Sequence, residues 1–253
     1  MDIAYNEAPF YVLFSAVTHH PFIHMDPETR EVRAFIFETE KLFNEGAEDF
    51  LEERHPLMKV ALTKREKKEF FNLCSYLGID TFVSYRADGI LTFKLGDVFL
   101  KREFMNLPGG KGMRKGEVIN PSLQSTILFF AQALNREVSP AEKRYGISAY
   151  NKKLEEGMRK STLLAPVIPK EGSNEYGLVI FNDANGGQWM PVFTDHMEYD
   201  QFNKENKFMA IRGTLKELTE SVVDRLSGII VNTNSVSLQI QKQLLDRILK
   251  VEE

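Results

Sequence analysis

The chain has 253 residues, of which 43% are hydrophobic and 27% charged, a globular composition that excludes a disordered chain. Its net charge of -4 does not favour nucleic acid or an anionic membrane, and a single cysteine, Cys74, excludes an intrachain disulfide. No run reaches the roughly 18 consecutive apolar residues of a membrane-spanning helix, and the N-terminus lacks the features of a signal peptide, so we expect a cytoplasmic protein.

The charge is unevenly distributed along the chain. Residues 101–160 contain twelve Lys/Arg and six Asp/Glu, a net charge of +6, which leaves -10 on the remainder. The glycine-rich stretch 108–112 lies in this basic segment and is the best candidate for a linker. Lys111, Arg114 and Lys115 could hold an anionic partner there, although a solvated linker is the simpler interpretation.

The first half of the chain predicts alternating strands and helices. In chain order these are strands at 10–17 and 32–37, a helix at 41–54, and strands at 57–62, 81–85 and 90–95. Thr63 and Glu66 have the spacing of a capping box, which predicts a helix that begins at Thr63 and ends at Gly78. Asp88 and Gly89 predict a hairpin between the last two strands.

The second half begins with two predicted helices. Asn120-Pro121 and Ser139-Pro140 each place a capping residue before a proline that suits the first helical position. The remaining predictions are strands at 161–168, 176–181 and 189–193, a short helix capped by Asp195, a strand at 208–211, a helix from Thr214 ended by Gly228, strands at 228–232 and 236–240 around a turn at 233–234, and an amphipathic C-terminal helix.

The two halves match in the order of their elements. Residues 57–63 correspond to 208–214, and residues 34–37 correspond to 190–193. This correspondence predicts an internal duplication and a mixed α/β fold, in which each repeat forms a mixed β-sheet covered by helices. We expect a degenerate first repeat over 1–118 and a second repeat with leading helices over 119–253, packed against each other.

Residues 119–253 resemble the SseB family, named for enhanced serine sensitivity. The resemblance is carried by 161–167, by 190–195 with its Pro-Val-Phe-Thr-Asp run, and by 226–232. Family members usually continue the last motif as Asn-Pro, whereas this chain has Asn232-Thr233. The resemblance implies a bacterial, cytoplasmic α/β domain without agreed catalytic residues.

Several residues are candidates for a ligand or partner surface. Thr194, Asp195 and Glu198 follow a strand, at the edge where α/β sheets bind ligands, although the same spacing is that of a helix cap. Trp189 and Tyr199 could anchor an interface or pack in the core. Two further candidates are Glu38 and Asn232.

No candidate supports a catalytic, metal or cofactor site. A sulfurtransferase needs an activated cysteine, but Cys74 lies on the apolar face of a predicted helix. His19, His20 and His24 could bind metal only if they converged, and adjacent histidines on an extended chain point in opposite directions, so we expect exposed loop histidines.

Two functions remain open from the sequence. The first is a non-catalytic module that binds a protein partner or regulates one. The alternative is an enzyme with a cleft between the repeats lined by carboxylates such as Glu38, Asp195 and Glu198. A deep pocket with converging polar groups would favour the enzyme, and an exposed binding surface would favour the module.

Overall fold

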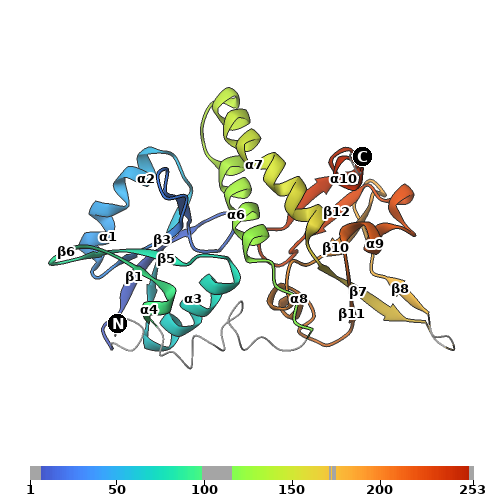
Figure 1. Cartoon of the computed structure of the whole chain (residues 1–253), viewed down its shortest axis with the longest axis horizontal. Coiled ribbons are helices and arrows are strands. Elements are labelled where there is room, and N and C mark those ends of the chain that lie inside the picture. Colours follow the sequence, from blue (N-terminus) through green and yellow to red (C-terminus); the bar gives the residue numbers. More distant parts are fainter. Residues whose placement is uncertain (1–6, 99–115, 171, 173–174, 251–253) are drawn as a thin grey trace.

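The computed structural model describes residues 7–98, 116–170, 172 and 175–250. The fold is mixed α/β, as the sequence predicts, and two halves that each carry a sheet lie on either side of helices α6 and α7 (Figure 1). We refer to residues 7–98 as the N-terminal half and to 116–250 as the C-terminal half. The basic residues Lys111, Arg114 and Lys115 lie outside the described residues.

The N-terminal half forms a sheet in the order β4-β1-β3-β5-β6, with β2 beside β3. Its elements are β1 (Phe10–Ser15), β2 (His24–Met25), β3 (Val32–Phe37), α1 (Glu40–Gly46), α2 (Glu48–Glu52), β4 (Leu57–Leu62), α3 (Lys64–Tyr76), β5 (Thr81–Arg86), β6 (Gly89–Lys94) and α4 (Leu95–Val98). Residues of α1 and α2 pack on one face of the sheet, and those of α3 pack on the other.

The C-terminal half repeats this pairing order. Its elements are α6 (Pro121–Asn135), α7 (Pro140–Lys160), β7 (Leu163–Pro169), β8 (Tyr176–Leu178), β9 (Phe181–Asn182), β10 (Gln188–Val192), α8 (His196–Phe202), β11 (Met209–Gly213), α9 (Leu215–Thr219), the 3-10 helix η1 (Val223–Arg225), β12 (Gly228–Val231), β13 (Leu238–Gln241) and α10 (Lys242–Leu249).

Two hydrogen-bonded strand groups, β13-β12-β10-β9 and β11-β7-β8, make up this half. An antiparallel bridge between Leu164 and Phe193 joins them and gives the order β11-β7-β10-β12-β13. Along these two five-strand orders, the central pairs β3–β5 and β10–β12 are parallel, and the other neighbouring strands are antiparallel. The shared order supports the predicted duplication.

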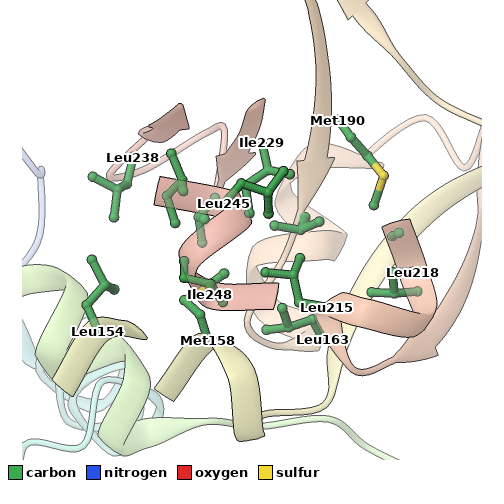
Figure 2. Packing of buried hydrophobic residues seen from close by; sticks show 14 of the residues in the cluster. Leu154, Met158, Leu163, Met190, Leu215, Leu218, Ile229, Leu238, Leu245 and Ile248 are labelled. Carbon is green, nitrogen blue, oxygen red and sulfur yellow. The ribbon is translucent and has the colours of Figure 1, made fainter. Parts of the chain in front are cut away.

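Helix α6 is buried between the two halves. Its residues Leu128 and Phe129 belong to the core of the N-terminal half, whereas Leu123, Ile127 and Phe130 belong to the core of the C-terminal half. Figure 2 shows the second core, in which labelled side chains of α7, α9 and α10 lie together with labelled strand residues such as Met190 of β10 and Ile229 of β12. The repeats are therefore joined through a shared helix as well as through direct contacts.

Local signals predicted the helix starts correctly, but the predicted cap by Asn120 is wrong, because its side chain makes no capping hydrogen bond at the start of α6. The backbone N–H of Thr63 donates to Glu66 Oε2 over 2.8 Å, and that of Thr214 donates to Glu217 Oε2 over 2.7 Å. Ser139 forms the same capping box at the start of α7. Such boxes satisfy donors that a helix start would otherwise leave unpaired.

Two predicted helices are wrong in extent. The 41–54 helix is two short helices, α1 and α2, which are separated at Ala47. The helix from Thr214 ends at Thr219, and a 3-10 turn follows. Gly228 is a strand residue, and an added Cβ there would lie 2.2 Å from the carbonyl oxygen of Ile240.

Two strand predictions also need correction. The 176–181 strand is two short strands, β8 and β9, which pair with different neighbours. The turn after β12 is longer than 233–234: Asn232 and Ser237 both adopt positive φ, at 53° and 47°, and the N–H of Ser237 donates to the carbonyl of Asn232. The last strand consequently begins at Leu238.

Candidate functional site

The structure brings four of the candidate residues together where β10 and β12 end. Thr194 and Asp195 follow β10, Glu198 lies in the first turn of α8, and Asn232 follows β12. Gln124 of α6 reaches into the middle of this group. These five side chains are fully buried, and we call them the polar cluster.

Hydrogen bonds connect every member of the polar cluster. Gln124 Nε2 donates to Asp195 Oδ2 over 2.8 Å, and Asn232 Nδ2 donates to Gln124 Oε1 over 3.2 Å. Thr194 Oγ1 donates to Asp195 Oδ2 over 3.0 Å, and the backbone N–H of Thr194 donates to Asn232 Oδ1 over 3.0 Å. The N–H of Glu198 donates to Asp195 Oδ1, which is the predicted cap of α8. Buried polar groups require such partners.

Glu198 links the cluster to the N-terminal half. Its carboxylate accepts from Ser235 Oγ over 2.8 Å, and His20 Nε2 lies 3.3 Å from its Oε1. His20 is only 5% exposed, so the expectation of exposed loop histidines is wrong for this residue. The sequence could not show the contact between His20 and Glu198, because the two residues are 178 positions apart.

Burial controls the chemistry of Asp195. Loss of solvation raises the pKa of its carboxyl above the usual value, and the nearby Glu198 carboxylate raises it further. Hydrogen bonds from Glu198 N–H, Gln124 and Thr194 oppose this effect. The two carboxyl groups are therefore held inside the protein by donors from α6, from α8 and from the residues that follow β10 and β12.

The polar cluster is not a surface. Thr194, Asp195, Glu198 and Asn232 are sealed from solvent, so their assignment to a ligand or partner surface is wrong. Tyr199 is also buried: its hydroxyl donates to the carbonyl of Phe208 over 2.9 Å, and its ring packs edge-to-face on Phe193. These residues stabilise the junction of α6, α8 and the sheet.

Glu38 and Trp189 lie elsewhere. Glu38 is exposed in the N-terminal half and accepts from the N–H of Ala87 over 2.9 Å, in the loop between β5 and β6. Trp189 is half-buried, and its Nε1 donates to Asp183 Oδ2 over 2.9 Å. Neither residue faces the polar cluster, so the predicted carboxylate-lined cleft of Glu38, Asp195 and Glu198 does not form.

The edge of the N-terminal sheet is the first exposed feature that could bind a partner. Arg86 pairs with Gly89 across a two-residue loop, and at the other end of the hairpin the N–H of Leu95 donates to the carbonyl of Asp80 over 2.8 Å, next to the Thr81–Lys94 pair. Because pairs alternate along a hairpin, the N–H and C=O of Ile90 and Thr92 point away from β5. Lys94 follows the same pattern, since its N–H donates to Asp97 outside the hairpin over 2.9 Å.

The side chains of β6 are also exposed. Ile90 is 66% exposed and Leu91 is 36% exposed, whereas Phe93 is buried in the core. Within the described residues, β6 pairs with β5 and with no other strand. The outward backbone groups of Ile90 and Thr92 in β6 are therefore not paired with another described strand. Figure 1 shows β6 at the outer margin of the N-terminal half.

The second exposed feature lies between the halves. An open cavity of about 660 Å³ is lined by Met25, Arg30 and Val32 from the N-terminal half and by Ser122, Lys153 and Lys160 from α6 and α7. An adjoining cavity of about 610 Å³ shares Asn120, Lys160 and Ser161 with it and extends to Arg212. We call the two cavities the α6 groove, and neither is lined by a carboxylate of the polar cluster.

Other proposed chemistry finds little support in the described residues. Cys74 is fully buried, and burial raises the pKa of its thiol, as expected for a structural cysteine. No group of three His, Cys, Asp or Glu residues in the described ranges has the arrangement of a metal site. No helix there is both long and apolar enough to cross a membrane.

Comparisons with known proteins do not establish a family. No protein-family model matches the chain, and no curated protein matches its sequence. Among solved structures, Tic22 from Anabaena, described as a protein of protein transport, shares 8% identity over 91% of this chain and 89% of its own, with a TM-score of 0.22. Tic22 from Plasmodium falciparum shares 11% identity over 86% of this chain and 84% of its own, also at 0.22. Scores this low do not demonstrate a common fold, and membership of the SseB family stays a prediction.

Proposed function

We propose that this protein is a non-catalytic module that binds a partner protein by pairing an extended segment of that partner with the free edge of β6. The observation that carries the proposal is the row of outward backbone groups at Ile90 and Thr92. An added strand would satisfy these groups, and side-chain contacts would provide specificity. Natural proteins usually protect such edges, so an exposed apolar edge favours a binding role.

The side chains around the edge support this function. Ile90 and Leu91 point to opposite faces of the sheet, so a docked strand would meet an exposed apolar side chain on each face. Glu38 fixes the hairpin loop through Ala87, which holds the edge in a defined position before a partner arrives. A preformed edge reduces the ordering entropy that binding costs.

The polar cluster supports a binding role over the enzymatic alternative. Its carboxylates are buried and fully hydrogen-bonded, whereas acid–base catalysis requires groups that reach a substrate. A bacterial, cytoplasmic module of the SseB family remains our proposal for its class, supported by the 190–195 motif.

Substitutions at Thr92 test the proposal. Thr92→Pro removes an outward N–H and spares the hydrogen bonds between β5 and β6, because proline is tolerated on sheet edges. Thr92→Val keeps the N–H and is the matched control. Full-length wild type and both variants are used to capture proteins from a native lysate, and the captured proteins are compared by mass spectrometry. We expect a partner that Thr92→Val retains and Thr92→Pro loses, while both variants unfold at the same urea concentration as wild type.

Two results would contradict this function. The first is a set of captured proteins that is identical for wild type and Thr92→Pro. The second is a wild-type protein that dimerises in sedimentation and becomes monomeric with Thr92→Pro, since β6 would then pair with a second copy of the chain.

A further inference from the structure

The α6 groove concentrates positive charge between the two halves. Arg30 approaches from the N-terminal half, Lys153 and Lys160 from α7, and Arg212 from β11. Two carboxylates line the groove, and one of them, Glu117, accepts a hydrogen bond from the hydroxyl of Tyr76 over 3.1 Å. Cationic side chains therefore outnumber the acidic ones.

The three cations of the larger cavity have no ionic partner among the described residues. Glu156 lies three positions after Lys153 and four before Lys160, spacings at which helical ion pairs commonly form. Neither pair is formed, and Arg30 also has no carboxylate within ion-pair distance in the described ranges. Unneutralised charges on the walls of a cavity focus a positive potential into it.

The floor of the same cavity is apolar. Met25 and Val32 contribute aliphatic surface, and the Phe129 and Tyr150 rings stack with centroids 5.3 Å apart and planes 5° from parallel. A ligand that fills the cavity would thus contact apolar surface with one part and cations with another. This combination of an apolar wall with a few charged groups is typical of small-molecule sites.

The start of α6 adds hydrogen-bond donors to the groove. Asn120 does not cap this helix, because its Nδ2 donates to the carbonyls of Thr162 and Thr194, over 2.7 and 2.6 Å. In the described structure, the N–H groups of Ser122 and Leu123 consequently have no protein acceptor. These two N–H groups could add hydrogen bonds to a ligand that is held mainly by the cationic side chains of the groove.

From the cavity, its cations and its apolar floor, we infer that the α6 groove binds a small organic phosphate that carries an apolar group. The guanidinium of Arg30 and the ammonium groups of Lys153 and Lys160 match the charge and the acceptor oxygens of a phosphate. The apolar group lies over Tyr150 and Met25. The groove shares no residue with β6, so this ligand site is independent of the partner edge.

Phenyl phosphate is the probe that tests the inference. Its binding to the full-length protein is measured by isothermal titration calorimetry, for wild type, Lys160→Gln and Lys152→Gln. Lys160 lines both cavities, whereas Lys152 is an exposed lysine on the same helix that lines neither. We expect saturable binding that Lys160→Gln weakens by about tenfold and that Lys152→Gln leaves unchanged, with the thermal midpoints of all three proteins alike.

Further ligands separate the contributions of charge and apolar contact. Inorganic phosphate and benzyl alcohol should each bind more weakly than phenyl phosphate, and benzoate should bind more weakly than phenyl phosphate because it carries less charge. The inference is overturned if wild type shows no saturable binding of phenyl phosphate, or if Lys152→Gln weakens binding as much as Lys160→Gln. Equal affinity for benzyl alcohol would overturn the charge requirement, and equal affinity for benzoate would overturn the assignment to phosphate.

Discussion

At the residue scale, burial decides what each polar group can do. Asp195 and Glu198 are acidic residues at a strand end, but the surrounding donors make them structural groups. Sequence spacing predicted the cap by Asp195, which is local. It missed Gln124, 71 positions from Asp195, because a glutamine within an apolar helix gives no signal of its distant partner.

Cys74 is predicted to react slowly in the native protein. Its thiol is fully buried and burial raises its pKa, so little thiolate is available at neutral pH. Native-state labelling with a thiol reagent should be much slower than labelling in urea. Cys74→Ser should lower the free energy of unfolding by about 1–3 kcal/mol, because the hydroxyl is a more polar group to bury. Rapid native labelling would contradict this.

Asp195 should reduce stability as the pH rises. Its pKa is higher in the folded chain than the usual 3.8, so the folded state binds the proton more tightly than the unfolded state. Its contribution to the free energy of unfolding is thus greatest below pH 3.8 and falls as pH rises through the folded pKa. The free energy of unfolding of wild type and Asp195→Asn should be measured in urea across this pH range. As the pH rises, the free energy of wild type should fall relative to that of Asp195→Asn.

Asp183 is the control for this pH dependence. The Trp189 hydrogen bond lowers the pKa of Asp183, followed by bonds from the N–H groups of Gly187 and Asn185. Its stabilisation should be present above the usual 3.8 and lost as pH falls through the lower folded pKa, so Asp183→Asn should show the opposite trend. Parallel trends for the two variants would contradict the assignment.

At the element scale, local signals predicted starts better than ends. Thr63 and Thr214 mark helix starts because a capping box is satisfied within four residues. Helix ends depend on packing. Helix α9 ends at Thr219, before the predicted end, and Gly228 lies in β12, where Trp189 and Ile240 leave no room for a side chain. Such close approaches are tertiary, so a glycine that seemed to end a helix in the sequence lies within a sheet.

The two caps should contribute similarly to stability despite their different helices. Thr63→Ala and Thr214→Ala should each lower the free energy of unfolding by about 0.5–2 kcal/mol, because each removes the hydroxyl of the capping box, which donates to the box glutamate over 2.6 Å at Thr63 and 2.9 Å at Thr214. Thr→Ser at the same positions keeps the hydroxyl and should restore most of the loss. Silent alanine variants in urea unfolding would show that the capping boxes contribute nothing.

At the scale of the whole molecule, apolar contacts through α6 dominate the junction of the halves. Polar contacts also cross it: Ile23 N–H donates to Gln132 Oε1 over 3.1 Å, and His20 meets Glu198. The sequence indicated the repeat because the order of elements survives in each half. The sequence did not indicate that α6 contributes residues to both cores, since the apolar pattern of a helix does not show which other elements the helix packs against.

The junction should therefore survive high salt. Exposed ion pairs contribute about 0–1 kcal/mol each and are screened, whereas burial of Leu128 and Phe129 is not. Small-angle scattering of the full chain at low and high salt should give the same radius of gyration. An extended, two-lobed profile at high salt alone would mean that charge attraction holds the halves together.

The position of α6 in the chain has a consequence during translation. The N-terminal half leaves the ribosome first, but Leu128 and Phe129, which complete its core, are synthesised after the 99–115 segment. Until then the surface that α6 covers is exposed to water, in the kind of incomplete intermediate that chaperones bind. The N-terminal half thus cannot finish folding before the C-terminal half begins to emerge, and the nascent chain must protect this surface until α6 arrives.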